Sequence, residues 1–285
     1  MSRRTPSPPH CPHPYPPATA AEPPELLLPE SEKPAPPPPA VADFARQELG
    51  FYPDEHQLRI LNATERRGII NCCRQWGKST TVAVRAVHFA YFTPGSTTIV
   101  ASRTARQSAE FMRKAARFLM ELRIAPRGDG TNNLSLLLPN GARIVGLPGK
   151  PDTIRGFSSV GLLLIDEASR VPDDLYRALR PMVAANADAA IWLMSTPNGR
   201  QGFFYEEWAR AVSGRHQDAW FHLAVPATEC PRILPAFLEE ERRDMGDEHF
   251  RQEYLCEFTT AQHAYFNTDA IDDAYHESDP SWGGL

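Results

Sequence analysis

The sequence GIINCCRQWGKS (residues 68–79) joins a short apolar run to a loop that contains glycine, lysine and serine. The apolar run predicts a buried strand, and residues 79–90 are typical of a helix. Residues 72–79 match the phosphate-loop pattern GxxxxGK[ST], except that Cys72 stands where the first glycine is expected. Because backbone N–H groups at the start of a helix bind phosphate, this strand–loop–helix unit predicts a nucleotide site.

The residues of this loop predict a site for ATP with Mg²⁺. Lys78 would reach the β- and γ-phosphates, and Ser79 would bind the metal. Arg74 would bring a second fixed positive charge near the phosphates. The nucleotide-binding residues expected from the loop and the first helical turn are Arg74, Gln75, Trp76, Gly77, Lys78, Ser79 and Thr80. Taken alone, the Gly-Lys-Ser sequence is equally consistent with a surface loop that has no function.

A second motif, LLLIDE at residues 162–167, places two carboxylates after four apolar residues. A wholly apolar strand is expected inside a parallel sheet, and the carboxyl end of such a strand is where an α/β site lies. Asp166 would hold Mg²⁺ through its water shell, and Glu167 would orient and deprotonate the attacking water. Strand ends also carry solvated acids, but the two motifs together favour a site that hydrolyses ATP.

Strand and helix patterns alternate along residues 41–258, which predicts one α/β domain. Further strands are expected at residues 97–101, 161–165, 189–195 and 219–225, with a hairpin of 134–138 and 142–147. Further helices are expected at residues 104–122, directly after Pro172, and at 202–212, 235–245 and 247–255. The pattern predicts a P-loop NTPase of the additional-strand, catalytic-glutamate type. Its central sheet would be mostly parallel, with helices on both faces.

Two weaker signals lie near the expected site. Ser195 and Thr196 follow an apolar strand, where a pair of hydroxyl groups could sense the γ-phosphate, although Pro-Asn-Gly after them is also typical of a simple turn. Gln57 precedes the phosphate loop and follows Phe51 and Tyr52. A glutamine amide can bond N6–H and N7 of adenine, and an aromatic ring can stack on the base.

The ends of the chain differ from this domain. The first 40 residues hold 15 of the 28 prolines, which predicts a disordered tail over residues 1–40. Residues 259–285 carry acids without accompanying apolar strands and are expected to be a linker. No apolar run approaches the length of a membrane span. The five cysteines are too few and too scattered for a disulfide framework, which indicates that the protein works in a reducing compartment.

The net charge of −5 gives no support for binding nucleic acid, so such binding would need a local patch. One candidate is the stretch 101–127, which has a local charge of +5. Its central basic residues are Arg113, Lys114 and Arg117, which we take as candidate DNA-binding residues. A solvated helix face is an equally good interpretation.

The ordered set of motifs resembles the large terminase subunit of tailed bacteriophages, over about residues 51–258. The motifs that carry this resemblance are YP…Q at 52–57, RQWGKS at 74–79, IRGF at 154–157, LIDEA at 164–168, STPNG at 195–199, GFFY at 202–205 and FRQEYLCEF at 250–258. The family tolerates a phosphate loop that lacks its first glycine and carries an arginine. The resemblance implies an ATP-driven motor that pumps double-stranded viral DNA through the portal into a preformed capsid.

The resemblance also implies partners and roles. Gln57 would be the adenine motif, and Ser195 with Thr196 would couple hydrolysis to movement. The partners would be double-stranded DNA, the portal protein, the small terminase subunit and further copies of this chain in a ring. The motor would work in the cytoplasm of the bacterial host, transiently docked on the procapsid. The family normally continues into a nuclease domain, for which residues 259–285 leave no room, so we expect no endonuclease activity from this sequence.

Arg155, in the loop before the acidic strand, is a candidate arginine finger for the ATP of a neighbouring subunit. An ion pair with Asp152 is the structural alternative for Arg155, and Arg74 is the rival catalytic arginine acting in cis. Two other functions remain open from the motifs. One is a superfamily 2 helicase-like translocase, which normally needs a second motor lobe, and the other is an assembly module that no longer hydrolyses ATP.

Overall fold

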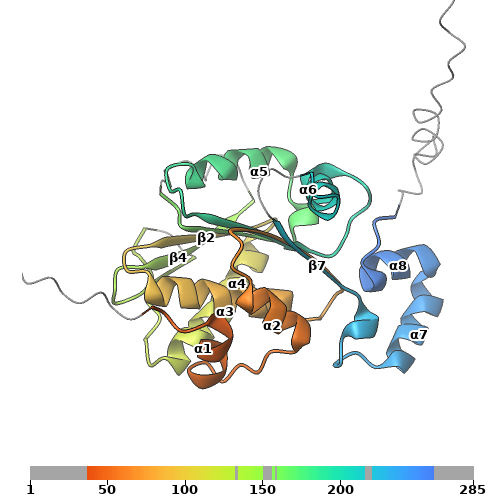
Figure 1. Ribbon diagram of the computed structural model, residues 1–285, viewed down its shortest axis with the longest axis horizontal. Coiled ribbons are helices and arrows are strands. Elements are labelled where there is room, and N and C mark those ends of the chain that lie inside the picture. The colour runs from red at the N-terminus through yellow and green to blue at the C-terminus, as the bar shows by residue number, and fades with distance from the viewer. Residues whose placement is uncertain (1–36, 132–133, 150–155, 158, 216–219, 260–285) are drawn as a thin grey trace, which may run out of the picture. The chain divides into compact units, whose positions relative to one another are not determined.

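Among the described residues, seven strands form one sheet in the order β3-β4-β2-β5-β6-β1-β7 (Figure 1). The computed structural model describes residues 37–131, 134–149, 156–157, 159–215 and 220–259. The strands are β1 (Arg67–Cys72), β2 (Thr97–Ser102), β3 (Ser135–Leu137), β4 (Arg143–Pro148), β5 (Leu162–Asp166), β6 (Ala190–Ser195) and β7 (Trp220–Val225). Each neighbouring pair is parallel except β3 and β4. The expected mostly parallel sheet is therefore confirmed, and the hairpin forms its antiparallel edge.

Helices cover both faces of this sheet, as expected. The helices are α1 (Val41–Gln47), α2 (Glu55–Asn62), α3 (Lys78–Phe92), α4 (Ala105–Glu121), α5 (Asp173–Leu179), α6 (Gly202–Val212), α7 (Pro235–Met245) and α8 (Asp247–Leu255). Helices α1 to α4 lie on one face, and α5 with α6 lies on the other (Figure 1). Successive strand residues alternate between two apolar cores: Ile70 and Leu164 belong to the first, Ile69 and Leu163 to the second.

The two short helices α1 and α2 were not expected from the sequence. Helix α2 begins at a capping box, in which Asp54 and Gln57 each accept a hydrogen bond from the other's backbone N–H. Helix α1 is held by Phe44, which is buried and packs edge-on against Phe92 of α3. Seven or eight residues give a weak periodic signal, and such short helices are stabilised mainly by packing.

Helices α7 and α8 follow β7 and pack on each other at that end of the sheet (Figure 1). Helix α8 ends at Leu255, and its C-cap residue Cys256 has a left-handed backbone with φ 60°. The Asn71 side chain donates a 2.8 Å hydrogen bond to the Cys256 carbonyl oxygen, which fastens the end of α8 to β1. Within the described part of the chain, no helix is both long and apolar enough to cross a membrane.

Trp192 of β6 shows how closely the sheet and its covering helices are fitted. Its ring is fully buried beside Gly68 of β1, the residue that pairs with it in the sheet. On the helical side, the Arg85 guanidinium lies 4.1 Å from the ring centroid. A Cβ atom placed on Gly68 would lie 2.4 Å from the Trp192 ring, so only glycine fits at this position.

We therefore expect Gly68→Ala to destabilise the fold by about 2–4 kcal/mol, since a fully packed core resists an added methyl group. Urea unfolding of the variant measures this loss. Gly128→Ala is the matched control, because the nearest atom to its added Cβ lies 3.7 Å away, an ordinary contact. Equal midpoints for the Gly68→Ala variant and the unsubstituted chain would contradict the close fit.

Candidate nucleotide site

Three loops meet at one edge of the sheet because β5, β6 and β1 are adjacent and parallel. Asp166 at the end of β5 pairs with Met194 of β6, and Ser195 at the end of β6 pairs with Asn71 of β1. The carboxyl ends of the three strands are therefore neighbours, which is where open parallel sheets bind ligands. Strand β6 separates the strand of the phosphate loop from the acidic strand, as the additional-strand class requires.

The phosphate loop needs glycine at position 77 but not at position 72. Gly77 is the N-cap of α3 with φ 104°, and its carbonyl oxygen accepts hydrogen bonds of 3.0 Å from the N–H groups of Thr80 and Thr81. Cys72 is the last residue of β1, fully buried, and is not among the residues with positive φ. Its sulfur lies 3.9 Å from the Ser195 carbonyl oxygen. A side chain is accommodated at this position, which explains how the loop forms without its first glycine.

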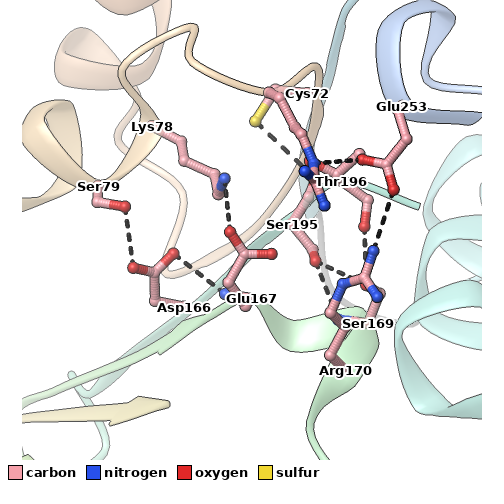
Figure 2. A network of polar contacts seen from close by, with 11 residues as sticks. Cys72, Lys78, Ser79, Asp166, Glu167, Ser169, Arg170, Ser195, Thr196 and Glu253 are labelled. Carbon is pink, nitrogen blue, oxygen red and sulfur yellow. Dashed lines mark hydrogen bonds and ion pairs between the residues drawn. The ribbon is translucent and has the colours of Figure 1, made fainter. Parts of the chain in front are cut away.

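The four residues expected to handle the phosphates and the metal make three direct contacts with one another (Figure 2). The Lys78 ammonium lies 2.7 Å from Glu167 Oε1. The Ser79 hydroxyl donates a 2.9 Å hydrogen bond to Asp166 Oδ2, and the other Asp166 oxygen accepts from the Glu167 N–H at 3.0 Å. The structure thus brings the two sequence motifs together, in the arrangement expected for a site that holds Mg²⁺ and ATP.

The burial of these groups changes their ionisation. Burial raises the pKa of Asp166 above its ordinary value, although Lys78 and the Ser79 hydrogen bond act in the opposite direction. Burial also disfavours the Lys78 ammonium, but the carboxylates of Glu167 and Asp166 favour it, and the pKa of Lys78 is raised overall. Lys78 is therefore charged at neutral pH. A divalent cation beside Asp166 would favour the ionised carboxylate.

Glu167 occupies a strained backbone conformation. Its φ of 54° and ψ of 43° lie in the left-handed region, which residues other than glycine seldom adopt. It caps the short 3₁₀ helix η2 (Ala168–Arg170), which turns the chain sharply after β5. Residues held in such regions cluster at active sites, because the surrounding structure must hold them there. The contact with Lys78 and the hydrogen bond to Asp166 hold Glu167 in this conformation, with its side chain lining the site.

The donor set fits Mg²⁺. Ser79 and Asp166 present a hydroxyl and a carboxylate oxygen 2.9 Å apart, both of the hard type that Mg²⁺ prefers. In the described residues, no group of three or more His, Cys, Asp or Glu side chains could hold a metal ion by itself. Mg²⁺ is usually bound by one or two protein groups together with substrate phosphates and water, so this sparse protein set is the expected one.

The residues expected to couple hydrolysis to movement connect two of the loops. The Ser195 hydroxyl accepts a 3.1 Å hydrogen bond from the Ser169 N–H and donates one of 2.8 Å to the Ser169 hydroxyl. The Ser169 hydroxyl in turn donates to the Thr196 carbonyl oxygen at 2.7 Å. The Thr196 hydroxyl is buried and has no hydrogen-bond partner within the part of the chain that the structure describes. The loop after β6 is therefore tied directly to the segment that follows Glu167.

Gln57 lies against the phosphate loop. Its side-chain nitrogen would be 3.1 Å from a Cβ placed on Gly77, so the two residues are in close contact. Its oxygen accepts the 3.0 Å capping hydrogen bond from the Asp54 N–H. Arg232 joins the same group, because it pairs with Asp54 at 2.9 Å and donates to the Trp76 carbonyl oxygen. Tyr52, by contrast, is 79% exposed.

A polar cavity of about 490 Å³ lies between these loops. Its lining residues are Arg74, Gln75, Lys78, Gln107, Glu167, Arg170 and Thr196. Sequence reasoning missed Arg170 and Gln107, as well as Glu253 of α8, which pairs with Arg74 and Arg170 (Figure 2). A signal existed for two of them, since Arg170 follows the acidic motif closely and Glu253 lies inside the motif FRQEYLCEF.

The other candidate residues lie elsewhere. Arg113, Lys114 and Arg117 of α4 line a separate groove of about 680 Å³ that reaches Thr80. Glu110 pairs with Arg113 in this groove, so its charge is mixed. Arg155 and Asp152 are outside the described residues, as are most of the tail 1–40 and the acids of the segment 260–285.

The model of the family "Terminase large subunit, T4likevirus-type, N-terminal" matches residues 69–273, more than half of this chain. The chain belongs to the terminase large subunit family. It is 25% identical to the terminase large subunit of Thermus phage G20c over an alignment 250 residues long, which covers 77% of this chain and 51% of that protein. The chain thus spans about half the length of this terminase relative, and the resemblance stated from the sequence is confirmed.

Solved terminase structures have the same fold. The ATPase domain of the Thermus phage P74-26 large terminase has a TM-score of 0.66 at 22% identity, covering 76% of this chain and 98% of that domain. The large terminase of another thermophilic bacteriophage, in complex with ADP, has a TM-score of 0.61 at 13% identity, covering 72% of this chain and 53% of that chain. These likenesses confirm the fold expected from the sequence motifs.

Proposed function

We propose that this chain is the ATP-hydrolysing motor domain of a terminase large subunit that moves double-stranded DNA into a capsid through a portal. The observation that carries the proposal is the set Lys78, Ser79, Asp166 and Glu167, which lies in direct contact at one edge of the sheet. Relatives that have the ATPase fold, one of them in complex with ADP, support a nucleotide as the ligand.

The geometry suggests how the reaction proceeds. Phosphate oxygens that enter the cavity compete with Glu167 for Lys78, because both are anions that seek the same ammonium group. Once Lys78 binds phosphate, the Glu167 carboxylate is released to accept a proton from water beside the γ-phosphate. Ser79 and Asp166 would hold Mg²⁺, which neutralises charge on the β- and γ-phosphates.

The remaining parts of the proposal come from the family. The partners would be the portal protein, the small terminase subunit and further copies of this chain arranged in a ring on the capsid. The motor would act in the cytoplasm of the bacterial host, docked on the procapsid only during packaging. Gln57 would contact adenine, and Ser195 with Thr196 would transmit the state of the γ-phosphate to the rest of the domain.

Glu167→Gln tests the proposal. We expect the variant to bind Mg·ATP as well as the unsubstituted chain and to hydrolyse it about 10²–10⁴-fold more slowly, because it removes the base and keeps the phosphate contacts. Steady-state phosphate release and nucleotide titration measure the two effects. Glu206→Gln is the control, since Glu206 is an exposed carboxylate on α6 that also pairs with a basic residue. Comparable turnover in Glu167→Gln would overturn the assignment of Glu167 as the base. An unsubstituted chain that bound Mg·ATP without turning it over would instead favour an assembly module without hydrolysis.

The α4 groove generates a prediction about DNA. Reversing Arg113, Lys114 and Arg117 to Glu should weaken non-specific binding, and the slope of log K against log salt should fall in magnitude by about 0.9 per lost phosphate contact. Reversal of Arg113 and Arg117 alone is the cleaner variant, because Lys114 also acts electrostatically on Asp166. Arg242 and Arg243 of α7 give a charge-matched control. An unchanged salt slope would indicate that the basic residues of α4 form a solvated helix face that does not bind DNA.

The arginine-finger hypothesis for Arg155 is tested by mixing two inactive variants. Arg155→Ala keeps Lys78, and Lys78→Ala keeps Arg155, so a mixed ring would contain some complete sites if Arg155 acts on a neighbour. We expect partial recovery of ATPase activity, since a supplied guanidinium contributes about 10³–10⁵-fold in rate. If activity did not recover in a preparation shown to form mixed rings, Arg155 would not be the arginine finger. Arg74 would then have this role, or the site would use no arginine finger.

A further inference from the structure

The nucleotide cavity is lined by two arginines as well as by Lys78. Arg74 belongs to the phosphate loop, and Arg170 ends the 3₁₀ helix that follows Glu167. Lys78 is already paired with Glu167, so the charge of the lysine is largely balanced within the site. The arginines are therefore the main source of positive charge available to a further phosphate group.

Both guanidinium groups are held by one carboxylate. Glu253 Oε2 lies 2.6 Å from Arg74 Nε, and Glu253 Oε1 accepts a 3.1 Å hydrogen bond from Arg170 Nη2 (Figure 2). The Glu253 side chain is only 13% exposed, and its backbone oxygen accepts from the Arg74 N–H at 3.2 Å. Two cations share a single anion, so this group of three side chains carries a net positive charge.

Each guanidinium group has N–H groups that Glu253 does not use. A guanidinium carries five N–H groups in a fixed plane. Among the described residues, Glu253 is the sole side-chain or backbone partner of the Arg74 and Arg170 guanidinium groups. The unused N–H groups belong to side chains that line the cavity, and the planar fork of arginine suits phosphate oxygens.

The position of Arg170 associates it with the terminal phosphate. Its backbone N–H donates a 2.9 Å hydrogen bond to the Glu167 carbonyl oxygen, so the two side chains leave the same tight turn. The neighbouring Ser169 is hydrogen-bonded to Ser195 and Thr196, which fixes this turn against the loop after β6. The Arg170 side chain is 28% exposed, so most of it is packed in place. It is thus a pre-positioned donor beside the expected catalytic base.

We propose that Arg170 binds the terminal phosphate of ATP within its own subunit, and that Glu253 is the positioning residue that holds Arg170 and Arg74 at the cavity. The inference rests on the proposed function, since it takes the ligand to be ATP. Glu253 acts through the arginines and does not touch the nucleotide. Helix α8 carries this carboxylate, and its Gln252 side chain accepts a 2.9 Å hydrogen bond from the Gly199 N–H, which steadies the helix against the site.

The test compares two nucleotides that differ in the terminal phosphate. Binding of Mg·ATPγS and of Mg·ADP is titrated on the full chain and on its variants. We expect Arg170→Ala to weaken Mg·ATPγS about tenfold, the loss of one charged hydrogen bond, and to change Mg·ADP less than twofold. Arg170→Lys, which keeps the charge, should recover part of the difference and serves as the second variant if the alanine protein folds poorly.

Glu253→Gln tests the positioning role. It should weaken Mg·ATPγS selectively, by about threefold or more, because a neutral amide no longer binds both cations. In an Arg74→Ala/Arg170→Ala background, the same change should have no further effect on the ratio of the two affinities. Glu257→Gln is the matched control, because Glu257 also pairs with an arginine of α8 but does not line the cavity.

The outcomes separate this inference from the proposed function. If the unsubstituted chain bound neither nucleotide, the proposed function would fall and this inference with it. If it bound Mg·ATPγS and Arg170→Ala weakened both nucleotides equally, or neither, only the role of Arg170 would be overturned. A selective effect of Glu253→Gln that persisted without the two arginines would overturn the positioning role.

Discussion

The parallel pairing of β6 with β5 on one side and β1 on the other is the constraint on which the site depends. Parallel strands place their carboxyl ends at one edge, so residues distant in the chain become neighbours there. Lys78, Glu167 and Thr196 come together in this way, each from a different loop. The apolar residues that bury these strands therefore also determine the arrangement of the polar groups at their ends.

Charge balance at this edge is local and incomplete. Lys78 is matched by Glu167, whereas Glu253 is shared between Arg74 and Arg170. Such partly buried pairs contribute little net stability to the fold, because the desolvation of each ion offsets much of the attraction. Their value lies in holding donors and acceptors at fixed positions before a polyanionic ligand arrives, which reduces the reorganisation that binding requires.

Much of the fold could be predicted because its strands are short apolar runs that end at polar or glycine-containing loops. Strands β1, β5 and β6 and their loops were located from such runs, and helix α5 was located from Pro172 and the acids after it. The short helices α1 and α2 could not be predicted in the same way. Their stability comes from contacts such as Phe44 with Phe92, which involve residues far apart in the sequence.

The same limit applied to the site. The residues of the two motifs could be assigned, because each motif combines residue types whose chemistry is specific in a short stretch. Arg170 lies close to the acidic motif and Glu253 lies inside the motif FRQEYLCEF, but their roles could not be assigned, since these depend on a pairing across 83 residues. The missing glycine at position 72 does not weaken the assignment of the phosphate loop. The backbone there is ordinary strand, and the Cys72 side chain fits within the core.

At position 167, the left-handed backbone lowers the stability of the fold, whereas the glutamate side chain serves the proposed activity. Glycine or asparagine would adopt that conformation with less strain, so selection for a stable fold alone would not choose a glutamate there. A laboratory evolution experiment that rewarded only heat resistance would tend to lose this side chain early. Engineering of a more robust domain should therefore leave position 167 unchanged and seek its stabilising substitutions elsewhere.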